Sequence, residues 1–261
     1  MEKEIYTHLQ IREVFHLEFL RWFSRKLEAE RYCLKGGVNL RFFFKSIRYS
    51  EDMDIDVTGA RVEKVKKTVM DILVTRGFSD SLKSFGIEQI VPPNMKKAKQ
   101  TETTQRFKIH LLTAAGEDLF TKIEFSRRGM KGTSLVEQVA APVLRSYKMA
   151  PLLISHYDTN SAVIQKIHAL AQRTVLQARD IFDLFWLNSQ WDTKALDKHI
   201  SKTVLKTAHD NIFQVGFNQF RDTVVDYLGE DDKKAYSSPE IWDEIKLKTA
   251  HFLEELTNEK K

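Results

Sequence analysis

Three aspartates at alternate positions, Asp52, Asp54 and Asp56, are the residues of this sequence with the clearest chemical potential. Apolar residues separate them in the stretch SEDMDIDV, so the pattern predicts a β-strand with all three carboxylates on one face. Carboxylates this close raise one another's pKa unless a cation lies between them, and their hard oxygens suit Mg²⁺ or Mn²⁺. The alternative is a solvent-facing edge strand whose acids discourage aggregation.

Two further features favour the metal interpretation. The glycine pair Gly36-Gly37 precedes a short apolar segment that predicts a helix, and the first N–H groups of such a helix can hold a phosphate. A separate acid, Glu124, lies in the alternating segment TKIEF, and on a neighbouring strand it would complete a triad with Asp52 and Asp54. Nucleotidyl transfer requires this set: space for a triphosphate, and acids for the metals that activate the nucleophile and neutralise the leaving pyrophosphate.

The N-terminal half of the chain mixes helical and strand patterns. Helical spacing of apolar residues predicts helices over 8–30 and 61–77, the second with a glycine in the C-cap position at its end. Alternation predicts a hairpin of two strands, 106–112 and 119–126, and the polar, proline-containing stretch 91–105 predicts a mobile loop. These elements would position the acids on a sheet.

The C-terminal half shows only helical patterns from about Ser161 onward. The expected fold class is therefore α+β: a sheet with flanking helices in the N-terminal half, followed by a C-terminal helical bundle. The predicted helices of the second half cover 161–176, 180–190, 194–226 with breaks, and 238–258.

Composition excludes several classes of protein. The chain has 261 residues, 42% hydrophobic and 30% charged, as in globular proteins with a proper core. No apolar run approaches the ~20 residues that span a bilayer, and the N-terminus does not have the pattern of a signal peptide, so we expect a cytoplasmic protein without membrane contact. One cysteine, Cys33, excludes an internal disulfide and a Cys-rich zinc site.

The formal net charge of +5 favours anionic partners only mildly, and solubility explains it equally well. The distribution of the charge says more, because basic residues concentrate in the predicted loops 96–99 and 127–131. The second loop directly follows the strand that carries Glu124, at the rim of the predicted site where an acceptor must enter. The predicted acceptor-binding residues are Arg127, Arg128 and Lys131.

Two segments resemble a known family. KGG and RYSEDMDID resemble the first motif of the nucleotidyltransferase AbiEii/AbiGii toxin family, a branch of the polymerase-beta-like nucleotidyltransferases. QKIHALAQRTVLQARDIFDLFWL, at 165–187, resembles the helical segment of this family, with a lysine, then x-x-A-L, an arginine and [KR]-D-x-x-D-L. The resemblance covers most of residues 10–190, in order. Gly37 stands where much of the wider superfamily has serine, which removes one hydroxyl ligand for phosphate.

The resemblance implies that the sheet is a nucleotidyltransferase-type mixed sheet, and that the protein is an NTP-dependent enzyme with Mg²⁺ or Mn²⁺ as cofactor. By this resemblance, Asp52 and Asp54 hold the metal, and Glu124 supports or deprotonates the acceptor hydroxyl. The implied residues are Asp52, Asp54, Glu124, Lys166 and Asp183 for catalysis, with Asp52, Asp54 and Glu124 as metal ligands, and Gly36, Gly37, Arg48, Ser50 and Lys166 for the nucleotide.

Some of these residues have a structural alternative. Lys166 and Arg173 share one stripe of a predicted helix, and Asp180 and Asp183 share a stripe of the next. The cations and acids could therefore simply pair and fix the two helices. The alternative for Ser50, two residues before the first aspartate, is a turn at the start of the strand. Asp56, outside the acid pair, is expected to be structural or to face solvent.

The sequence is thus interpreted as the toxin of a toxin–antitoxin or phage-defence system that transfers nucleotides from an NTP to RNA, with tRNA as the expected acceptor and a cognate antitoxin protein encoded nearby. The expected domains are 1–150, a nucleotidyltransferase core, and 151–261, a helical domain that completes the active site. Two alternatives are open: a nucleotidyltransferase that modifies a protein side chain, and a binding module without catalysis. The first would not depend on the basic loops.

Overall fold

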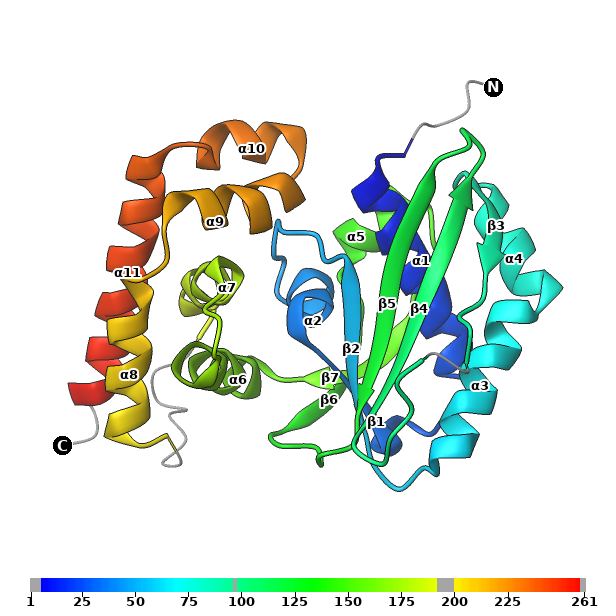
Figure 1. The fold of residues 1–261 in the computed structure, drawn as a ribbon, viewed down its shortest axis with the longest axis horizontal. Coiled ribbons are helices and arrows are strands. Elements are labelled where there is room, and N and C mark those ends of the chain that lie inside the picture. The colour runs from blue at the N-terminus through cyan, green and yellow to red at the C-terminus, as the bar shows by residue number, and fades with distance from the viewer. Residues whose placement is uncertain (1–5, 96–97, 192–199, 259–261) are drawn as a thin grey trace. The chain divides into compact units, whose positions relative to one another are not determined.

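The structure, a computed structural model, describes residues 6–95, 98–191 and 200–258 (Figure 1). A mixed sheet with flanking helices is followed by a purely helical region, so the predicted α+β class is confirmed. Within the described parts of the chain, no helix is long and apolar enough to cross a membrane.

The chain divides into two compact units, which we call the sheet unit and the helical unit. The division differs from the predicted boundary at residue 150, because residues 153–157 form a strand of the sheet. A short segment from the first half of the sequence also belongs to the helical unit. The sheet unit comprises Met1–Phe43 and Tyr49–Tyr157, and the helical unit comprises Phe44–Arg48 and Asp158–Lys261.

The sheet unit is built on a seven-stranded sheet, counted over the described residues, with the order β3-β4-β5-β2-β1-β7-β6. The pairs β2–β5 and β1–β7 are parallel, and the other neighbouring pairs are antiparallel. The predicted strand of aspartates and the predicted hairpin are confirmed as β2, β4 and β5. The strands are β1 Tyr32–Lys35, β2 Asp52–Val57, β3 Ile87–Val91, β4 Thr104–Thr113, β5 Asp118–Ser126, β6 Ser134–Gln138 and β7 Leu153–Tyr157.

The first helix, α1 (His8–Phe23), begins at a capping box in which Thr7 and Gln10 bond each other's backbone N–H. It was predicted to run to residue 30 but ends at Phe23. The prediction was too long because Leu27 continues the helical spacing of apolar residues and is buried in the same core, although it lies beyond the helix. Residues 29–31 form a single turn of 3₁₀ helix before β1.

The helix predicted over 61–77 is in fact two helices, α3 (Val62–Val74) and α4 (Arg76–Lys83). The chain turns at Thr75, whose extended backbone separates them. Gly77 is therefore not a C-cap but part of α4, where it packs against the ring of Trp22. The sheet unit also contains α2 (Gly36–Phe43) and α5 (Ala141–Ser146).

One face of the sheet is apolar and forms the core with the helices. Phe107 and Ile109 of β4 and Ile123 and Phe125 of β5 are fully buried, and they share a core with the aromatic residues of α1. Figure 1 shows α1 behind β4 and β5. Because side chains alternate along a strand, the residues between these apolar positions lie on the opposite face. That face carries the charged residues of β2, β4 and β5.

The helical unit packs around a second aromatic core. Phe220 and Trp242 stack with ring centroids 4.3 Å apart, and Phe182 lies 6.1 Å from Phe220. Helices form over most of each range predicted from Ser161 onward, and a further helix, α10 (Glu230–Tyr236), lies outside these ranges. Residues 194–199 of one predicted range lie outside the described part of the chain. The helices are α6 Thr159–Gln172, α7 Ala178–Asn188, α8 Lys202–Ile212, α9 Phe217–Thr223, α10 Glu230–Tyr236 and α11 Pro239–Asn258.

Candidate active site

A row of charged residues crosses the open face of the sheet around Asp54. Asp54 of β2 is the register partner of Lys35 on β1 and of Glu124 on β5, and Glu124 is the partner of Arg106 on β4. Register partners on neighbouring strands project from the same face. The structure therefore places Glu124 beside Asp54, on a neighbouring strand, as the alternating pattern predicted.

The two acids that flank Asp54 are each held by a cation. Asp52 pairs with Lys122, whose Nζ lies 2.7 Å from its Oδ2. Arg106 donates to Glu124 Oε2, with Nε 2.8 Å and one terminal nitrogen 2.7 Å away. Neither cation was predicted from the sequence, although the strand period alone puts Lys122 on the same face as Glu124. The signal for Lys122 was therefore present in the pattern.

Asp54 itself is the acid without a direct partner among the described residues. Burial raises the pKa of its carboxyl group; Lys35 and Lys122 oppose that rise, whereas Glu124 and Asp52 add to it. The carboxylate form is therefore disfavoured where it stands, and an added cation would stabilise it.

The turn from β1 into α2 approaches Asp54 closely. Gly36 has φ of 71°, in the left-handed region, and a Cβ built on it would lie 3.2 Å from Asp54 Oδ2. A side chain here meets both a backbone penalty and the carboxylate, so glycine is required for two reasons. The structure thus brings the predicted glycine and the predicted acid together.

We expect Gly36→Ala to reduce nucleotide transfer more than stability. The left-handed backbone costs alanine about 1–2 kcal/mol, and the new methyl group displaces the Asp54 carboxylate. Gly59→Ala is the matched control, because Gly59 has φ of 64° with nothing within 4 Å of its Cβ position. Chemical denaturation and transfer assays on both variants separate the effects. Equal activity in the two variants would contradict a role for the contact with Asp54.

Asp56 and Ser50 have structural contacts. Asp56 is buried, with Lys35 Nζ 2.6 Å from Oδ1 and the Tyr157 hydroxyl donating to Oδ2 at 2.7 Å. Burial and the Asp56 carboxylate both raise the pKa of Tyr157. The Ser50 hydroxyl donates to the backbone carbonyl of Asp52 at 2.8 Å, as in a turn. Asp56 is therefore structural, one of the two outcomes expected for it.

The three residues predicted to bind the acceptor in the second basic loop, 127–131, differ in their contacts and exposure. Arg127 is already bound locally, because its guanidinium donates to Gln105 Oε1 at 2.9 and 2.8 Å and to the carbonyl of Ala60. Burial lowers the pKa of Arg127. Arg128 and Lys131 are exposed. Of the first loop, residues 96–97 lie outside the described part of the chain.

The helical unit holds the other predicted residues in a buried ion cluster. Lys166 Nζ lies 3.0 Å from Asp180 Oδ1 and 2.6 Å from Asp183 Oδ2, and both aspartates are fully buried. Arg48 donates to both Asp183 oxygens from one nitrogen, at 2.9 Å, and Arg173 Nε lies 3.0 Å from Asp180 Oδ2. This pairing fixes α6 to α7, the structural alternative considered for these charges.

The charges of this cluster determine the protonation of Asp183. Burial raises the pKa of its carboxyl group, but Arg48 and Lys166 together outweigh burial and hold the pKa below its usual value. Arg48, predicted beside the triphosphate, is itself buried and directed at Asp183. No feature of the sequence indicated that pairing, since the two residues are 135 positions apart.

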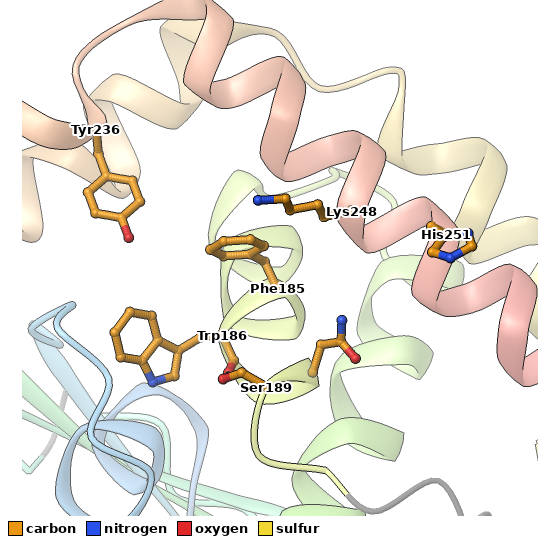
Figure 2. Close-up of a pocket in the computed structure, with 7 residues that line it drawn as sticks. Phe185, Trp186, Ser189, Tyr236, Lys248 and His251 are labelled. Atoms are coloured by element: carbon orange, nitrogen blue, oxygen red, sulfur yellow. The ribbon is translucent and has the colours of Figure 1, made fainter.

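A pocket of about 440 Å³ also lies within the helical unit, and Figure 2 shows its aromatic lining of Phe185, Trp186 and Tyr236. Lys248 of α11 lies near the Phe185 ring, with its Nζ 6.0 Å from the ring centroid, and His251, farther along α11, also lines the pocket. Glu244 neutralises Lys248 at 2.5 Å, and Glu255 lies 3.1 Å from His251. The pocket therefore presents aromatic surface without an excess of positive charge.

Solved structures share this fold. MenT4, a nucleotidyltransferase toxin from Mycobacterium tuberculosis H37Rv, is similar with a TM-score of 0.57 and 17% identity, over 95% of this chain and 85% of that one. JHP933 from Helicobacter pylori is similar with a TM-score of 0.53 and 16% identity, over 98% and 95% of the two chains. At these identities the likeness concerns the fold alone. No curated protein matches the chain in sequence.

The chain shares its fold with a nucleotidyltransferase toxin and carries acids on adjacent strands of its sheet. The model of the family "Nucleotidyl transferase AbiEii toxin, Type IV TA system" matches residues 18–257. The chain belongs to this family and is a nucleotidyltransferase toxin of a type IV toxin–antitoxin system. An NTP substrate and a cognate antitoxin follow from that membership, and the resemblance stated from the sequence is confirmed.

Proposed function

We propose that this toxin transfers nucleotides from an NTP to RNA, with tRNA as the acceptor and a divalent cation at Asp52 and Asp54. The supporting observation is Asp54: a carboxylate disfavoured by burial, without a direct partner in the described residues, and next to Glu124 in register. We further propose that the protein acts in the cytoplasm and that its biological setting is phage defence, on family resemblance.

The donor set fits Mg²⁺ or Mn²⁺ by its chemistry. Asp52 and Asp54 offer hard oxygens from one face of one strand, and the raised pKa of Asp54 reports a carboxylate that a cation would stabilise. No group of three His, Cys, Asp or Glu side chains among the described residues is arranged as a metal site. Lys122 and Arg106 hold Asp52 and Glu124 in this structure, so these acids must exchange partners for all three to ligate together.

In the proposed reaction, an acceptor hydroxyl oxygen attacks the α-phosphorus of the NTP and the bond to pyrophosphate breaks. Glu124 accepts the hydroxyl proton, and Arg106 holds that carboxylate in position. A bound divalent cation would neutralise charge on the phosphates as pyrophosphate leaves. The turn at Gly36 keeps side chains away from Asp54, which leaves space for phosphate.

Lys166 of the helical unit is proposed as the phosphate ligand that the resemblance implies. An ammonium group has three donors, and Asp180 and Asp183 accept from two directions, which leaves one donor for a phosphate oxygen. Asp183 then acts by positioning Lys166, and Arg48 acts by positioning Asp183. This assignment revises the predicted direct contact between Arg48 and the nucleotide.

The test is incubation with each labelled NTP in the presence of host RNA and, separately, host protein. We expect label in RNA, concentrated in the tRNA fraction, and loss of that label in Asp54→Asn. Label in protein instead would favour the alternative in which a side chain is modified. No label in either polymer, with NTP bound, would favour the binding module.

We expect the double variant Arg128→Gln/Lys131→Gln to weaken acceptor binding about uniformly across RNA sequences. For each phosphate contact that is lost, the magnitude of the slope of log affinity against log salt concentration should decrease by about 0.7–0.9. Both side chains are exposed, so the fold should be unaffected, whereas Arg127→Gln should lower stability because it loses the bonds to Gln105. Fluorescence anisotropy over a salt series measures the slope. Unchanged affinity at every salt concentration would remove this loop from the acceptor site.

A further inference from the structure

An exposed aromatic pair extends the charged face of the sheet along β4 and β5. Phe120 is 51% exposed, and its ring stacks on His110 with centroids 4.5 Å apart and planes inclined by 15°. The two residues are register partners, and His110 is fixed by Asp118, 2.7 Å from its Nε2. Leu111, next to His110, is fully buried on the core face. The pair is therefore a rigid, outward-facing platform on an otherwise polar sheet surface.

Cations lie beside this platform. Lys108 of β4 is exposed, and in the described part of the chain it has no ion pair. It is the register partner of Lys122, so two lysines face each other across the strands, an arrangement that costs stability unless an anion lies between or above them. Asp52 neutralises only Lys122. The structure retains an uncompensated positive charge here.

The same lysine also lines a hollow of about 380 Å³. Lys99, Arg106 and Lys108 line it; Glu124 pairs with Arg106, whereas Lys99 and Lys108 have no ion pair among the described residues. Two lysines of the hollow are therefore without a neutralising acid, whereas the one lysine of the aromatic pocket in the helical unit, Lys248, is paired with Glu244. The hollow is complementary to phosphate. The remaining lining residues are Pro93, Asn94 and Ala98.

The platform, the cations and the acids follow one another in register. Along β5, Phe120, Lys122 and Glu124 share one face, and each step of two residues advances about 7 Å. The platform is thus about 13 Å from Glu124. The basic loop of Arg128 lies beyond the opposite end of β5. A chain lying on the platform would reach the acid row along the strands.

We infer that this face binds the single-stranded end of the RNA acceptor, with a base stacked on Phe120–His110 and phosphates on Lys108 and in the hollow. The inference rests on the proposed function, in which RNA is the acceptor. Exposed rings combined with a basic groove bind unpaired nucleotides, since every base has a face to stack and every nucleotide a phosphate. A duplex, whose bases are already stacked on each other, cannot use the platform.

The experiment compares binding of a short fluorescein-labelled oligoadenylate with binding of its duplex with oligouridylate. We expect the parent protein to prefer the single strand. Phe120→Ala should weaken single-strand binding about tenfold, the effect of losing one base–aromatic stack, and Phe120→Tyr should restore it. Lys108→Gln should weaken binding and reduce the salt slope by about 0.7.

Matched controls lie elsewhere on the chain. Phe213 of the helical unit is 49% exposed and has His209 5.6 Å away, so Phe213→Ala removes a comparable ring. Lys64→Gln removes the same charge from an exposed lysine of α3. Neither control should change single-strand affinity. An equal loss in Phe120→Ala and Phe213→Ala would overturn the inference, as would equal affinity of the parent for both RNA forms.

Separate NTP titrations distinguish failure of this inference from failure of the proposed function. If the parent binds NTP and Phe120→Ala binds the single strand normally, the platform is not the acceptor site while the proposed function stands. If Phe120→Ala loses NTP affinity but not oligonucleotide affinity, the platform holds the base of the NTP and the inference is wrong. If the parent labels protein and no RNA, the proposed function fails as well.

Discussion

Asp54→Asn is expected to lower the rate of nucleotide transfer about 10³-fold or more and to leave the protein folded. Charge stabilisation by a bound divalent cation contributes several kcal/mol to a phosphoryl-transfer transition state, and a neutral amide at this position would weaken the hold on that cation. Asp54 lies beside Glu124 at the centre of the charged row and has no direct partner in the described residues. Its loss removes no ion pair from the fold.

The same substitution should leave stability unchanged or raise it slightly. Burial raises the pKa of Asp54 above its value in the unfolded chain, so its ionised form opposes folding at neutral pH. The penalty begins above the unfolded pKa, near 4, and is complete once pH exceeds the folded pKa. The stability difference between variant and parent should therefore be largest at neutral pH and shrink as pH falls towards 4. Urea denaturation at several pH values measures it.

Asp56→Asn is the matched control, with the same chemical change on the same face of the same strand. Asp56 accepts from Lys35 and Tyr157 and is buried, so its variant should lose about 1–3 kcal/mol of stability. Loss of folding at Asp54 together with tolerance at Asp56 would reverse the roles assigned here. Transfer at the parental rate in Asp54→Asn would show that this acid holds no cation.

The acids could be predicted because a strand has an unambiguous period. Alternation alone put Asp52 and Asp54 on one face and Glu124 on another strand, and the register brings Asp54 and Glu124 together. The cations that hold these acids also lie on predicted strands. Lysine and arginine are common on strands, however, so the sequence pattern does not identify the acid with which each one pairs. Only the register identified Lys122 and Arg106 as those partners.

The short, buried strands β1 and β7 were not predicted, for a different reason. β1 has four residues, and β7 has five, of which four are buried. Such short apolar runs carry no clear period, because burial on both faces removes the alternation that identifies a strand. The helix predicted over 8–30 was too long for the opposite reason. Leu27 has the spacing of a helical core residue and is buried in the core, but it lies beyond the end of α1. Burial, not helical geometry, placed that leucine.

The charges of α6 and α7 show where sequence spacing stops being informative. Lys166 and Asp183 occupy the positions that both a catalytic set and a helix-fixing ion pair require. The structure establishes the ion pair and adds Arg48 from a distant segment, which no spacing rule connects to α7. Residues far apart in sequence meet through folding alone, so this partner could be found only in the folded chain.

Asp183→Asn is expected to destabilise the helical unit by about 3–5 kcal/mol. Removing one member of a buried ion pair leaves its partners charged and uncompensated in the interior, and here two cations, Arg48 and Lys166, lose their shared carboxylate. Asp210→Asn on α8 is the control, because Asp210 is exposed and its contact with His209 is worth little. Thermal and urea denaturation of both variants provide the comparison.

The acid limb of the stability curve tests the same cluster independently. The pKa of Asp183 is held below its unfolded value, so its ionised form stabilises the fold at neutral pH, and that contribution is lost as pH falls from about 4 through the folded pKa. The Asp183→Asn variant lacks this group, and its stability should fall less steeply there than that of the parent. Parallel acid limbs, or a loss below about 1 kcal/mol at pH 7, would mean that Arg48 and Lys166 are not held by Asp183. Lys166 would then be held by Asp180 alone and would have two donors for phosphate.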